Sequence, residues 1–238
     1  RRLIYGRLRR PISNGMKAVI LAGGLGTRLH PVTLETPKPL LTIKRKPILN
    51  HLLELFSRHA IDEPIVLINK SHQDDYLWWR KRYQNELPPK LIVEIEPEPL
   101  GTFGGLRGLR AGLQETFILS NGDELKDFHL TNLVEFHKNN PAKPAATIAL
   151  VKVENPSDYG VPVISGDKIK EFLEKPENPP SNFISSGLYV LEPEVFEYAD
   201  WDKGHLMIEK DIFPKLAAAG RLAGYKVENG RWYDCGTF

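Results

Sequence analysis

The chain has 238 residues, of which 41% are hydrophobic and 26% charged, a composition typical of a globular protein and not of a disordered one. Its formal net charge of +2 includes five arginines in residues 1–10, without which it would be −3, so no basic surface for nucleic acid is indicated. The single cysteine, Cys235, excludes an internal disulfide framework and favours a reducing, cytoplasmic compartment.

Residues 1–15 are predicted to be an N-terminal extension outside the fold. They lack the apolar core of a secretory signal. No apolar run in the sequence has the length that crossing a bilayer requires, so we expect no membrane association. Met16 opens the first structured segment, and we expect one domain over residues 16–238.

Strand and helix patterns alternate through the first half of the chain. Short apolar runs predict strands at 18–22, 65–68, 91–95 and 116–120. Amphipathic spacing predicts helices at 47–59, 72–83 and 103–113. This alternation predicts an α/β fold with a Rossmann-like, doubly wound, mostly parallel sheet flanked by helices, whose ligands sit beyond the carboxyl ends of the strands.

The second half is less regular. We expect a helix at 130–139, strands at 145–153, 161–164, 168–173 and 183–191, and a helix at 207–218. The turn at 165–167 joins two of these strands as a hairpin. No internal repeat or linker marks a domain boundary.

A glycine-rich loop follows the first strand. Gly23, Gly24 and Gly26 allow a tight turn in which backbone N–H groups approach an anion, and Arg28 and Lys38 add fixed cations. The pattern matches neither the Rossmann fingerprint nor the Walker motif, because Thr27 and Arg28 replace the third glycine and no Gly-Lys-Ser/Thr follows. It predicts a cradle for a polyphosphate.

Leu-Ala-Gly-Gly-x-Gly-Thr-Arg-Leu at 21–29, followed by Thr-Pro-Lys-Pro-Leu-Leu at 36–41, resembles the nucleotide-sugar pyrophosphorylases, and the resemblance extends over residues 16–237. It implies the nucleotide-diphospho-sugar transferase type of fold and makes residues 16–238 a nucleotidyltransferase catalytic domain. It also implies nucleotide contacts from the loop, namely Leu21, Ala22, Gly23, Gly24, Gly26 and Thr27. Arg28 would then act on the departing β,γ-phosphates and Lys38 on the reacting phosphates.

Two aspartates are candidate metal ligands. Asp123 ends the strand at 116–120 after Asn121-Gly122, and Asp234 precedes a Gly-Thr turn. Mg²⁺ is commonly held by one or two carboxylates together with substrate phosphates. Both positions match motifs that supply the metal ligands in the resembled family, which implies Mg²⁺ as the cofactor.

Four residues are candidates for binding the sugar phosphate. Glu174-Lys175-Pro176 is similar to the family's Glu-Lys-Pro, in which Lys binds the sugar-1-phosphate and Glu the sugar hydroxyls. Gly160 lies in a Tyr-Gly-Val that resembles the family's backbone contact to the sugar. Ser185 stands where many members have a sugar-contacting Asn, and its hydroxyl reaches less far than an amide.

The turn Glu96-Pro-Glu-Pro-Leu-Gly101-Thr102 aligns with the family's base-reading turn. Glu96 replaces the Gln of several thymidylyl and uridylyl members. A carboxylate only accepts hydrogen bonds, and guanine offers adjacent N–H donors, whereas the carbonyls of uracil and thymine would repel it. Together with a likeness to mannose-1-phosphate guanylyltransferases, this favours GTP, with Gly101 and Thr102 also at the nucleotide.

The expected reaction joins a nucleoside triphosphate, best GTP, to a sugar-1-phosphate, best mannose-1-phosphate, by Mg²⁺-dependent in-line displacement of pyrophosphate. The alternatives are a uridylyl- or thymidylyltransferase for glucose-1-phosphate or another hexose- or heptose-1-phosphate, a nucleotide-sugar-dependent glycosyltransferase, and a non-catalytic regulatory paralogue. The glycosyltransferase would usually show Asp-x-Asp where this chain has Gly-Asp-Glu. Assembly stays open, with a homodimer as the family expectation.

Overall fold

The strand that leads into the glycine loop, β1 (Ala18–Leu21), lies inside a nine-stranded sheet, between β4 (Pro64–Asn69) and β6 (Phe117–Asn121). The computed structural model describes residues 15–24, 26, 29 and 31–235. The sheet order is β5-β4-β1-β6-β11-β8-β12-β10-β9. The remaining strands of the sheet are β5 (Ile92–Glu96), β8 (Ala146–Lys152), β9 (Gly160–Ser165), β10 (Lys168–Glu174), β11 (Phe183–Leu191) and β12 (Leu222–Lys226).

Side chains that alternate along β1 are buried in two different cores. Ala18 and Ile20 pack into a core shared with α2 (Ile48–Arg58), α3 (Gln73–Arg82) and α5 (Leu130–Asn139). Val19 packs into the opposite core. A strand covered on both faces needs apolar residues at successive positions, which explains its continuous hydrophobic run.

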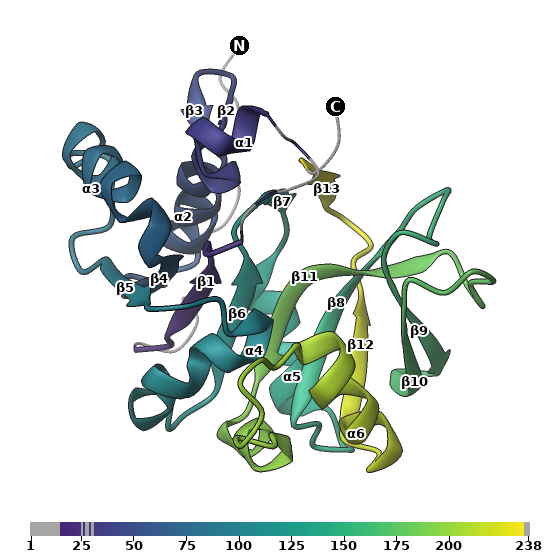
Figure 1. The fold of residues 1–238 in the computed structure, drawn as a ribbon. Helices are drawn as coiled ribbons and strands as arrows, with labels where there is room; N and C mark the ends of the chain where they lie inside the picture. Colours follow the sequence, from purple (N-terminus) through teal and green to yellow (C-terminus); the bar gives the residue numbers. More distant parts are fainter. Residues whose placement is uncertain (1–14, 25, 27–28, 30, 236–238) are drawn as a thin grey trace.

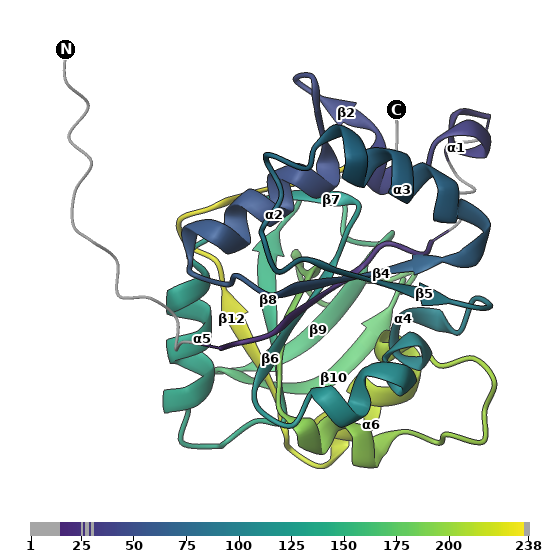
Figure 2. The ribbon, with the colours of Figure 1, turned by 90° about the vertical axis from the view of Figure 1, so that its left-hand side faces the viewer.

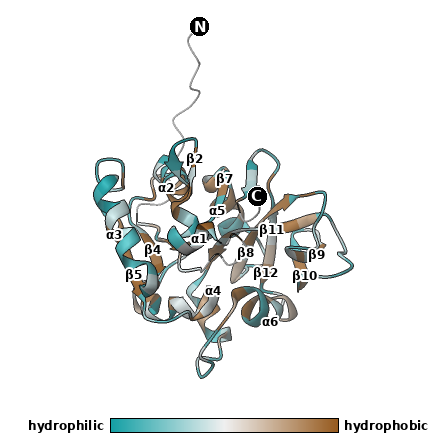
Figure 3. Ribbon diagram, turned by 45° about the horizontal axis from the view of Figure 1, so that its top comes forward, coloured by the Kyte–Doolittle hydropathy of each residue, from teal (hydrophilic) through white to brown (hydrophobic). Residues whose placement is uncertain are grey.

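The second core is covered by shorter helical segments. These are α4 (Gly101–Gly104), the 3-10 helices η4 (Gly105–Gly112) and η5 (Pro193–Tyr198), the π-helical turn η6 (Ile208–Ile212) and α6 (Phe213–Ala218). Figures 1 and 2 show α2 and α3 on one side of the sheet and α4 and α6 on the other. The hydrophobic ribbon segments in Figure 3 gather in the strands between these layers. The molecule is therefore a three-layer α/β fold.

Seven of the nine strands run in one direction, and only β11 and β10 run against them. The carboxyl ends of β1, β5 and β6 consequently lie at one edge of the sheet. The antiparallel strand β11 begins at that same edge, because its Leu188 pairs with Ser120 near the end of β6. This confirms the predicted doubly wound, mixed sheet and explains which loops share a site.

Two small ribbons complete the fold. β2 (Thr42–Ile43) pairs with β3 (Lys46–Pro47), after the short helices α1 (Val32–Glu35) and η2 (Lys38–Leu40). β7 (Glu124–Asp127) pairs with β13 (Arg231–Asp234) in antiparallel register. The 3-10 helix η3 (Lys70–His72) leads into α3.

Two predicted helices differ in detail. The segment predicted as a helix at 103–113 is mostly 3-10, and four glycines within it, at 104, 105, 108 and 112, lower its helix propensity. The segment at 207–218 is a π-helical turn followed by α6, which has proline at its start. Of the extension predicted at residues 1–15, residues 1–14 lie outside the described residues.

In the part of the chain that the structure describes, no helix has both the length and the apolar character needed to cross a membrane.

Candidate active site

Lys38 lies between the two aspartates predicted to bind metal. Its Nζ is 2.6 Å from Asp123 Oδ2 and 3.8 Å from Asp234 Oδ1. The Lys38 side chain is 8% exposed, against 34% for Asp123 and 16% for Asp234. The lysine is thus a nearly buried cation whose charge is shared by two carboxylates, and these carboxylates face each other across it.

The pairing of β7 with β13 brings the aspartates together. Asp234 is the register partner of Glu124, which directly follows Asp123. Glu124 accepts hydrogen bonds from Trp232 Nε1 at 2.9 Å, Lys126 Nζ at 2.9 Å and Asn121 Nδ2 at 3.2 Å. Burial raises the pKa of Glu124, and the neighbouring Lys126 opposes that rise. Glu124 therefore anchors the ribbon that carries both aspartates.

The described part of the glycine loop is held by close contacts on both sides. A Cβ at Gly23 would lie 2.8 Å from Glu96 Oε2 and 3.2 Å from Asn69 N, so a side chain there would displace the Glu96 carboxylate. Gly26 has φ +62°, and its carbonyl accepts a 2.7 Å hydrogen bond from Thr33 Oγ1. Tyr76 Oη donates to the Ala22 carbonyl at 2.9 Å. Gly24 is exposed with open space where a Cβ would be, so its backbone is accessible.

Leu21 ends β1 and pairs with Asn121 at the end of β6. The Leu21 carbonyl also accepts a 2.9 Å hydrogen bond from Gly122 N. The loop and the Asp123 turn are therefore joined directly. Thr27 and Arg28, predicted to bind the nucleotide and to act on its phosphates, lie outside the described residues.

Glu96 ends β5 beside the glycine loop. The residue is 8% exposed, and its carboxylate lies between Gly23 and Gly105. The Leu100 N–H donates to this carboxylate, yet Oε1 has no hydrogen-bond partner among the described residues. Burial raises the pKa of Glu96, and the Leu100 hydrogen bond opposes the rise. A buried acceptor without a donor is costly and suits a ligand that supplies one.

Gly101 and Thr102 contact another part of the chain. Gly101 has φ +85°, and its Cα lies so close to the Leu206 carbonyl that a Cβ would collide with it. Thr102 Oγ1 donates to Glu209 Oε2 at 2.7 Å and accepts from Ile208 N at 2.9 Å. The described contacts of both residues thus fix the turn onto the segment before α6.

Gly160 and Glu174 face each other as register partners on β9 and β10. A Cβ at Gly160 would lie 3.1 Å from Glu174 Oε2. The next residue, Lys175, is exposed and has φ +52°, and its N–H donates to the Tyr159 carbonyl at 3.0 Å. A side chain in this left-handed conformation is strained, so the backbone at Lys175 is fixed by its surroundings.

Tyr159 connects this region to the aspartates. Its hydroxyl donates to Asp234 Oδ2 at 3.2 Å. Burial, followed by the charge of Asp234, raises the pKa of Tyr159 to about 12. The tyrosine therefore keeps its proton near neutral pH and holds Asp234 against the strand pair that carries Glu174.

Ser185 lies near the start of β11, where the register with β8 shifts. Its hydroxyl donates to Tyr189 Oη at 3.3 Å and accepts from Gly187 N at 3.3 Å. A Cβ at Gly187, which has φ +61°, would lie 2.8 Å from Glu124 Oε1. The Ser185 turn and the Asp123 turn are thus in contact through Gly187.

Sequence reasoning did not assign roles to Tyr76, Glu124, Tyr159 or Glu209. For two of them the sequence offers a signal, because each is adjacent to a predicted site residue: Glu124 directly follows Asp123, and Tyr159 directly precedes Gly160. Tyr76 and Glu209 form hydrogen bonds with residues 54 and 107 positions away in the sequence, so no local pattern could reveal their roles.

The donor set fits a small divalent cation. The carboxylates of Asp123 and Asp234 are hard oxygen ligands, and Lys38 occupies the point to which both are directed. Groups of three or more His, Cys, Asp and Glu side chains arranged around one metal are absent from the described residues. A cation at this place would accordingly depend on substrate phosphates for further ligands.

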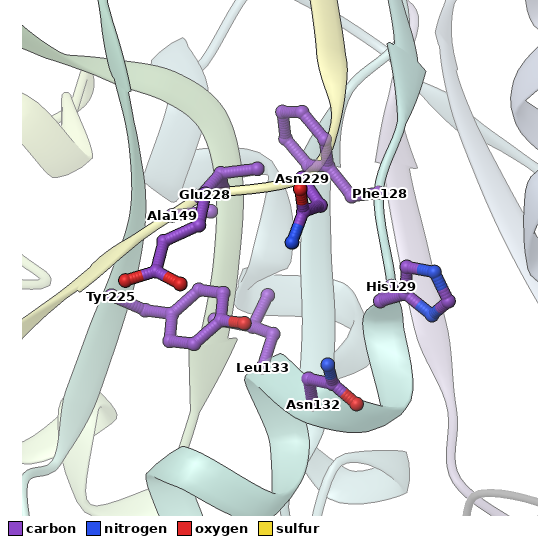
Figure 4. A pocket seen from close by; sticks show the side chains of 9 residues that line it. Phe128, His129, Asn132, Leu133, Ala149, Tyr225, Glu228 and Asn229 are labelled. Atoms are coloured by element: carbon purple, nitrogen blue, oxygen red, sulfur yellow. The ribbon is translucent and has the colours of Figure 1, made fainter.

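Two cavities lie beside the β7–β13 ribbon. One is lined by Phe128, His129, Asn132, Leu133, Ala149, Tyr225, Val227, Glu228 and Asn229, and Figure 4 shows the Tyr225 and Glu228 side chains beside it. The other runs between the β2–β3 ribbon and the β7–β13 ribbon, and Asp234 forms part of its wall. Of the predicted site residues that the structure describes, only Asp234 lines either cavity.

The chain is similar to other proteins in sequence and in fold. The chain is 38% identical over 227 residues to "Mannose-1-phosphate guanylyltransferase 1" of Arabidopsis thaliana and 39% identical over 227 residues to "Mannose-1-phosphate guanylyltransferase catalytic subunit beta" of Xenopus tropicalis. Each alignment covers 93% of this chain, which spans 61% of each relative's length. The crystal structure of HddC from Yersinia pseudotuberculosis complexed with GMP-PN superposes with a TM-score of 0.76 at 28% identity, covering 93% of this chain and 94% of that one.

The profile of the family described as "Nucleotidyl transferase" matches residues 17–238. That match covers the glycine loop, Lys38, both aspartates and the strand pair of Gly160 and Glu174. The chain belongs to the nucleotidyl transferase family.

Proposed function

We propose that the chain catalyses the transfer of a guanylyl group from GTP to mannose-1-phosphate, giving GDP-mannose and pyrophosphate. The observation that carries the reaction type is the Asp123–Lys38–Asp234 arrangement beside the glycine loop. Two carboxylates and a nearly buried cation at a phosphate-binding edge suit a reaction in which charge moves between phosphates. The proposal concerns a chain that spans 61% of the length of its Arabidopsis relative.

Glu96 supports guanine as the base. Its carboxylate lies beside Gly23 of the glycine loop, and guanine presents N1–H and N2–H₂ on one edge, from which a carboxylate can accept hydrogen bonds. Uracil and thymine would place carbonyl oxygens against the same carboxylate, which is unfavourable. The complex of HddC with GMP-PN and the names of the two relatives support the same choice.

The choice of mannose as the sugar is supported by the names of the relatives and by the arrangement of residues around Ser185. Ser185 and Glu174 offer a hydroxyl and a carboxylate for sugar hydroxyls, and Gly160 lies directly against Phe172 and Glu174. A sugar that differs from mannose at one hydroxyl would leave one of these groups without a partner, which costs binding free energy.

No covalent intermediate on the protein is required, because the phosphate of the sugar-1-phosphate is itself an anionic nucleophile. One of its oxygens forms a bond to the α-phosphorus of GTP, and the bond from that phosphorus to the β-phosphate oxygen breaks, releasing pyrophosphate. The protein then acts by positioning and by electrostatic stabilisation. We assign Lys175 to the incoming phosphate and Lys38 to the reacting phosphates. From the sequence motif alone, we assign Arg28 and the glycine loop to the departing pyrophosphate.

Mg²⁺ is the proposed cofactor, held by Asp123 and Asp234. When bound, it would neutralise phosphate charge that the protein's cations do not cover. Tyr159 would orient Asp234 through its 3.2 Å hydrogen bond, and Glu124 would hold the ribbon beneath both ligands. A cytoplasmic location and a homodimer stay predictions.

The reaction is tested by incubating the chain with GTP and mannose-1-phosphate and identifying the product by mass spectrometry. GDP-mannose is expected with MgCl₂ and not with EDTA. Absence of any nucleotide-sugar from the MgCl₂ sample would overturn the proposal. UTP and dTTP in parallel samples test the uridylyl- and thymidylyltransferase alternative, because product from those nucleotides alone would favour it.

A further inference from the structure

The turn that carries Glu96, Gly101 and Thr102 is bonded to a segment about 100 residues further along the chain. Phe103 N and Gly104 N donate to the Leu206 carbonyl at 2.9 and 3.1 Å. Leu206 N donates in return to the Leu100 carbonyl at 2.8 Å. Three backbone hydrogen bonds therefore hold the two segments together.

One side-chain contact extends this unit towards η6. Thr102 Oγ1 donates to Glu209 Oε2 at 2.7 Å while accepting from Ile208 N at 2.9 Å. A hydroxyl that donates to a carboxylate at this distance makes a charge-assisted hydrogen bond, stronger than a neutral one. Ile208 and Glu209 begin a π-helical turn, a form that is rare and frequent at functional sites.

The η6 segment continues into the helix that supports the sugar side. Phe213, at the start of α6, packs edge-on against Phe172 of β10 and Tyr189 of β11, with ring centroids 5.1 and 5.2 Å apart. Phe172 lies two residues before Glu174, and the Tyr189 hydroxyl accepts the hydrogen bond from Ser185. The strands that carry Glu174 and Ser185 thus both contact Phe213 of α6.

These contacts form one continuous path from the base-reading turn to the sugar subsite. We propose that the Thr102–Glu209 hydrogen bond couples the two subsites, so that nucleotide binding raises the affinity for the sugar-1-phosphate, with Thr102 and Glu209 as positioning residues. The inference rests on the proposed function. According to this inference, Thr102 of the Leu-Gly-Thr turn affects binding of the sugar-1-phosphate, and it does so through Glu209 and α6.

Burial raises the pKa of Glu209, and the Thr102 hydrogen bond opposes the rise. Acidic groups facing Glu209 are Glu174 and Glu124, and Tyr189 also lies within its electrostatic reach. Loss of the Thr102 hydroxyl would leave this carboxylate without its strongest donor, so its position relative to Tyr189 would change.

The test uses the whole chain and three variants. Thr102→Val removes the hydroxyl at nearly constant volume, and Thr102→Ser restores it. Thr116→Val is the matched control, because Thr116 Oγ1 also donates to a glutamate, Glu192, at 2.9 Å, but does so before the start of β6, at the opposite edge of the sheet. Melting temperatures of all variants show whether each is folded.

Calorimetry measures the dissociation constant of mannose-1-phosphate with and without an α,β-methylene analogue of GTP. We expect the analogue to tighten sugar phosphate binding by about fivefold or more in the wild type, a usual size for coupled sites. Thr102→Val should abolish this tightening, Thr102→Ser should restore it, and Thr116→Val should retain it. Unchanged coupling in a folded Thr102→Val variant, or no coupling in a wild type that turns over, would overturn the inference. Absence of turnover by the wild type would instead overturn the proposed function.

Discussion

Lys38 Nζ lies 2.6 Å from Asp123 Oδ2, although the two residues are 85 positions apart in the sequence. The contact joins the segment after the glycine loop to the segment after β6. Asp234 reaches the same lysine from the C-terminal ribbon. One cation thus ties together three parts of the chain that arrive at the sheet edge separately.

Asp123→Asn should lower kcat by about 100-fold or more, because it removes a charge at the centre of the reacting groups. The melting temperature should change little, since asparagine has the same shape. Asp127→Asn is the control. Asp127 is on the same ribbon, is 55% exposed and pairs with Arg58 at 3.4 Å, away from Lys38. Full activity of Asp123→Asn in a pyrophosphate-release assay would show that this carboxylate is dispensable.

Lys38→Met leaves Asp123 and Asp234 facing each other without their shared cation. The loss in stability is expected to be about 1–2 kcal/mol after allowing for the exposure of Asp123. For a domain of this size that lowers Tm by about 2–8 °C. Added MgCl₂ should raise the Tm of the variant more than that of the wild type, because a cation bound only by the folded state stabilises it.

Lys46→Met removes a lysine from the β2–β3 ribbon, where its partner is Glu54, and serves as the control for charge alone. Its Tm should respond to MgCl₂ as the wild type does. Equal responses of Lys38→Met and Lys46→Met would argue against a metal site at the two aspartates.

Glu96→Gln should shift the nucleotide preference. The amide can donate to a carbonyl of uracil or thymine, and it loses the charged acceptor for guanine. A hydrogen bond to a charged group contributes about 1.5–3 kcal/mol, so kcat/KM for GTP relative to UTP should fall by about 10- to 100-fold. Glu98→Gln, an exposed glutamate of the same turn, should leave the ratio unchanged. An unaltered ratio for Glu96→Gln would place base recognition elsewhere.

The pH dependence of stability should include a contribution from Glu209. Burial raises its pKa above the ordinary value of 4.5, so the folded state binds a proton more tightly than the unfolded state does. Its favourable contribution is complete below pH 4.5 and is lost as pH rises through the folded-state pKa. Glu209→Gln removes this loss, and its Tm relative to wild type should therefore rise as the pH increases above 4.5. A constant difference across that range would contradict the raised pKa.

The first half of the sheet could be predicted because its signals are local. Continuous apolar runs mark β1, β4 and β6, whose residues are buried on both faces. β12 could not be predicted, because Gly224 interrupts its pattern. That glycine is needed, since a Cβ there would lie 2.6 Å from Leu150 Cδ1.

The site could be predicted only in part. Asp123 follows a recognisable strand, but nothing local pairs Asp234 with Glu124 across β7 and β13. Their association depended on a family resemblance. The contact of Thr102 with Glu209 also joins distant segments. The turn motif by itself predicts that Thr102 contacts the nucleotide and does not indicate its contact with Glu209.

Pyrophosphate release tests the proposed reaction most directly. The chain is assayed with MgCl₂, each of the four nucleoside triphosphates and a panel of sugar-1-phosphates. Release is predicted to be fastest with GTP and mannose-1-phosphate and to disappear in Asp123→Asn. No release with any pair would contradict the assignment of this site to nucleotidyl transfer.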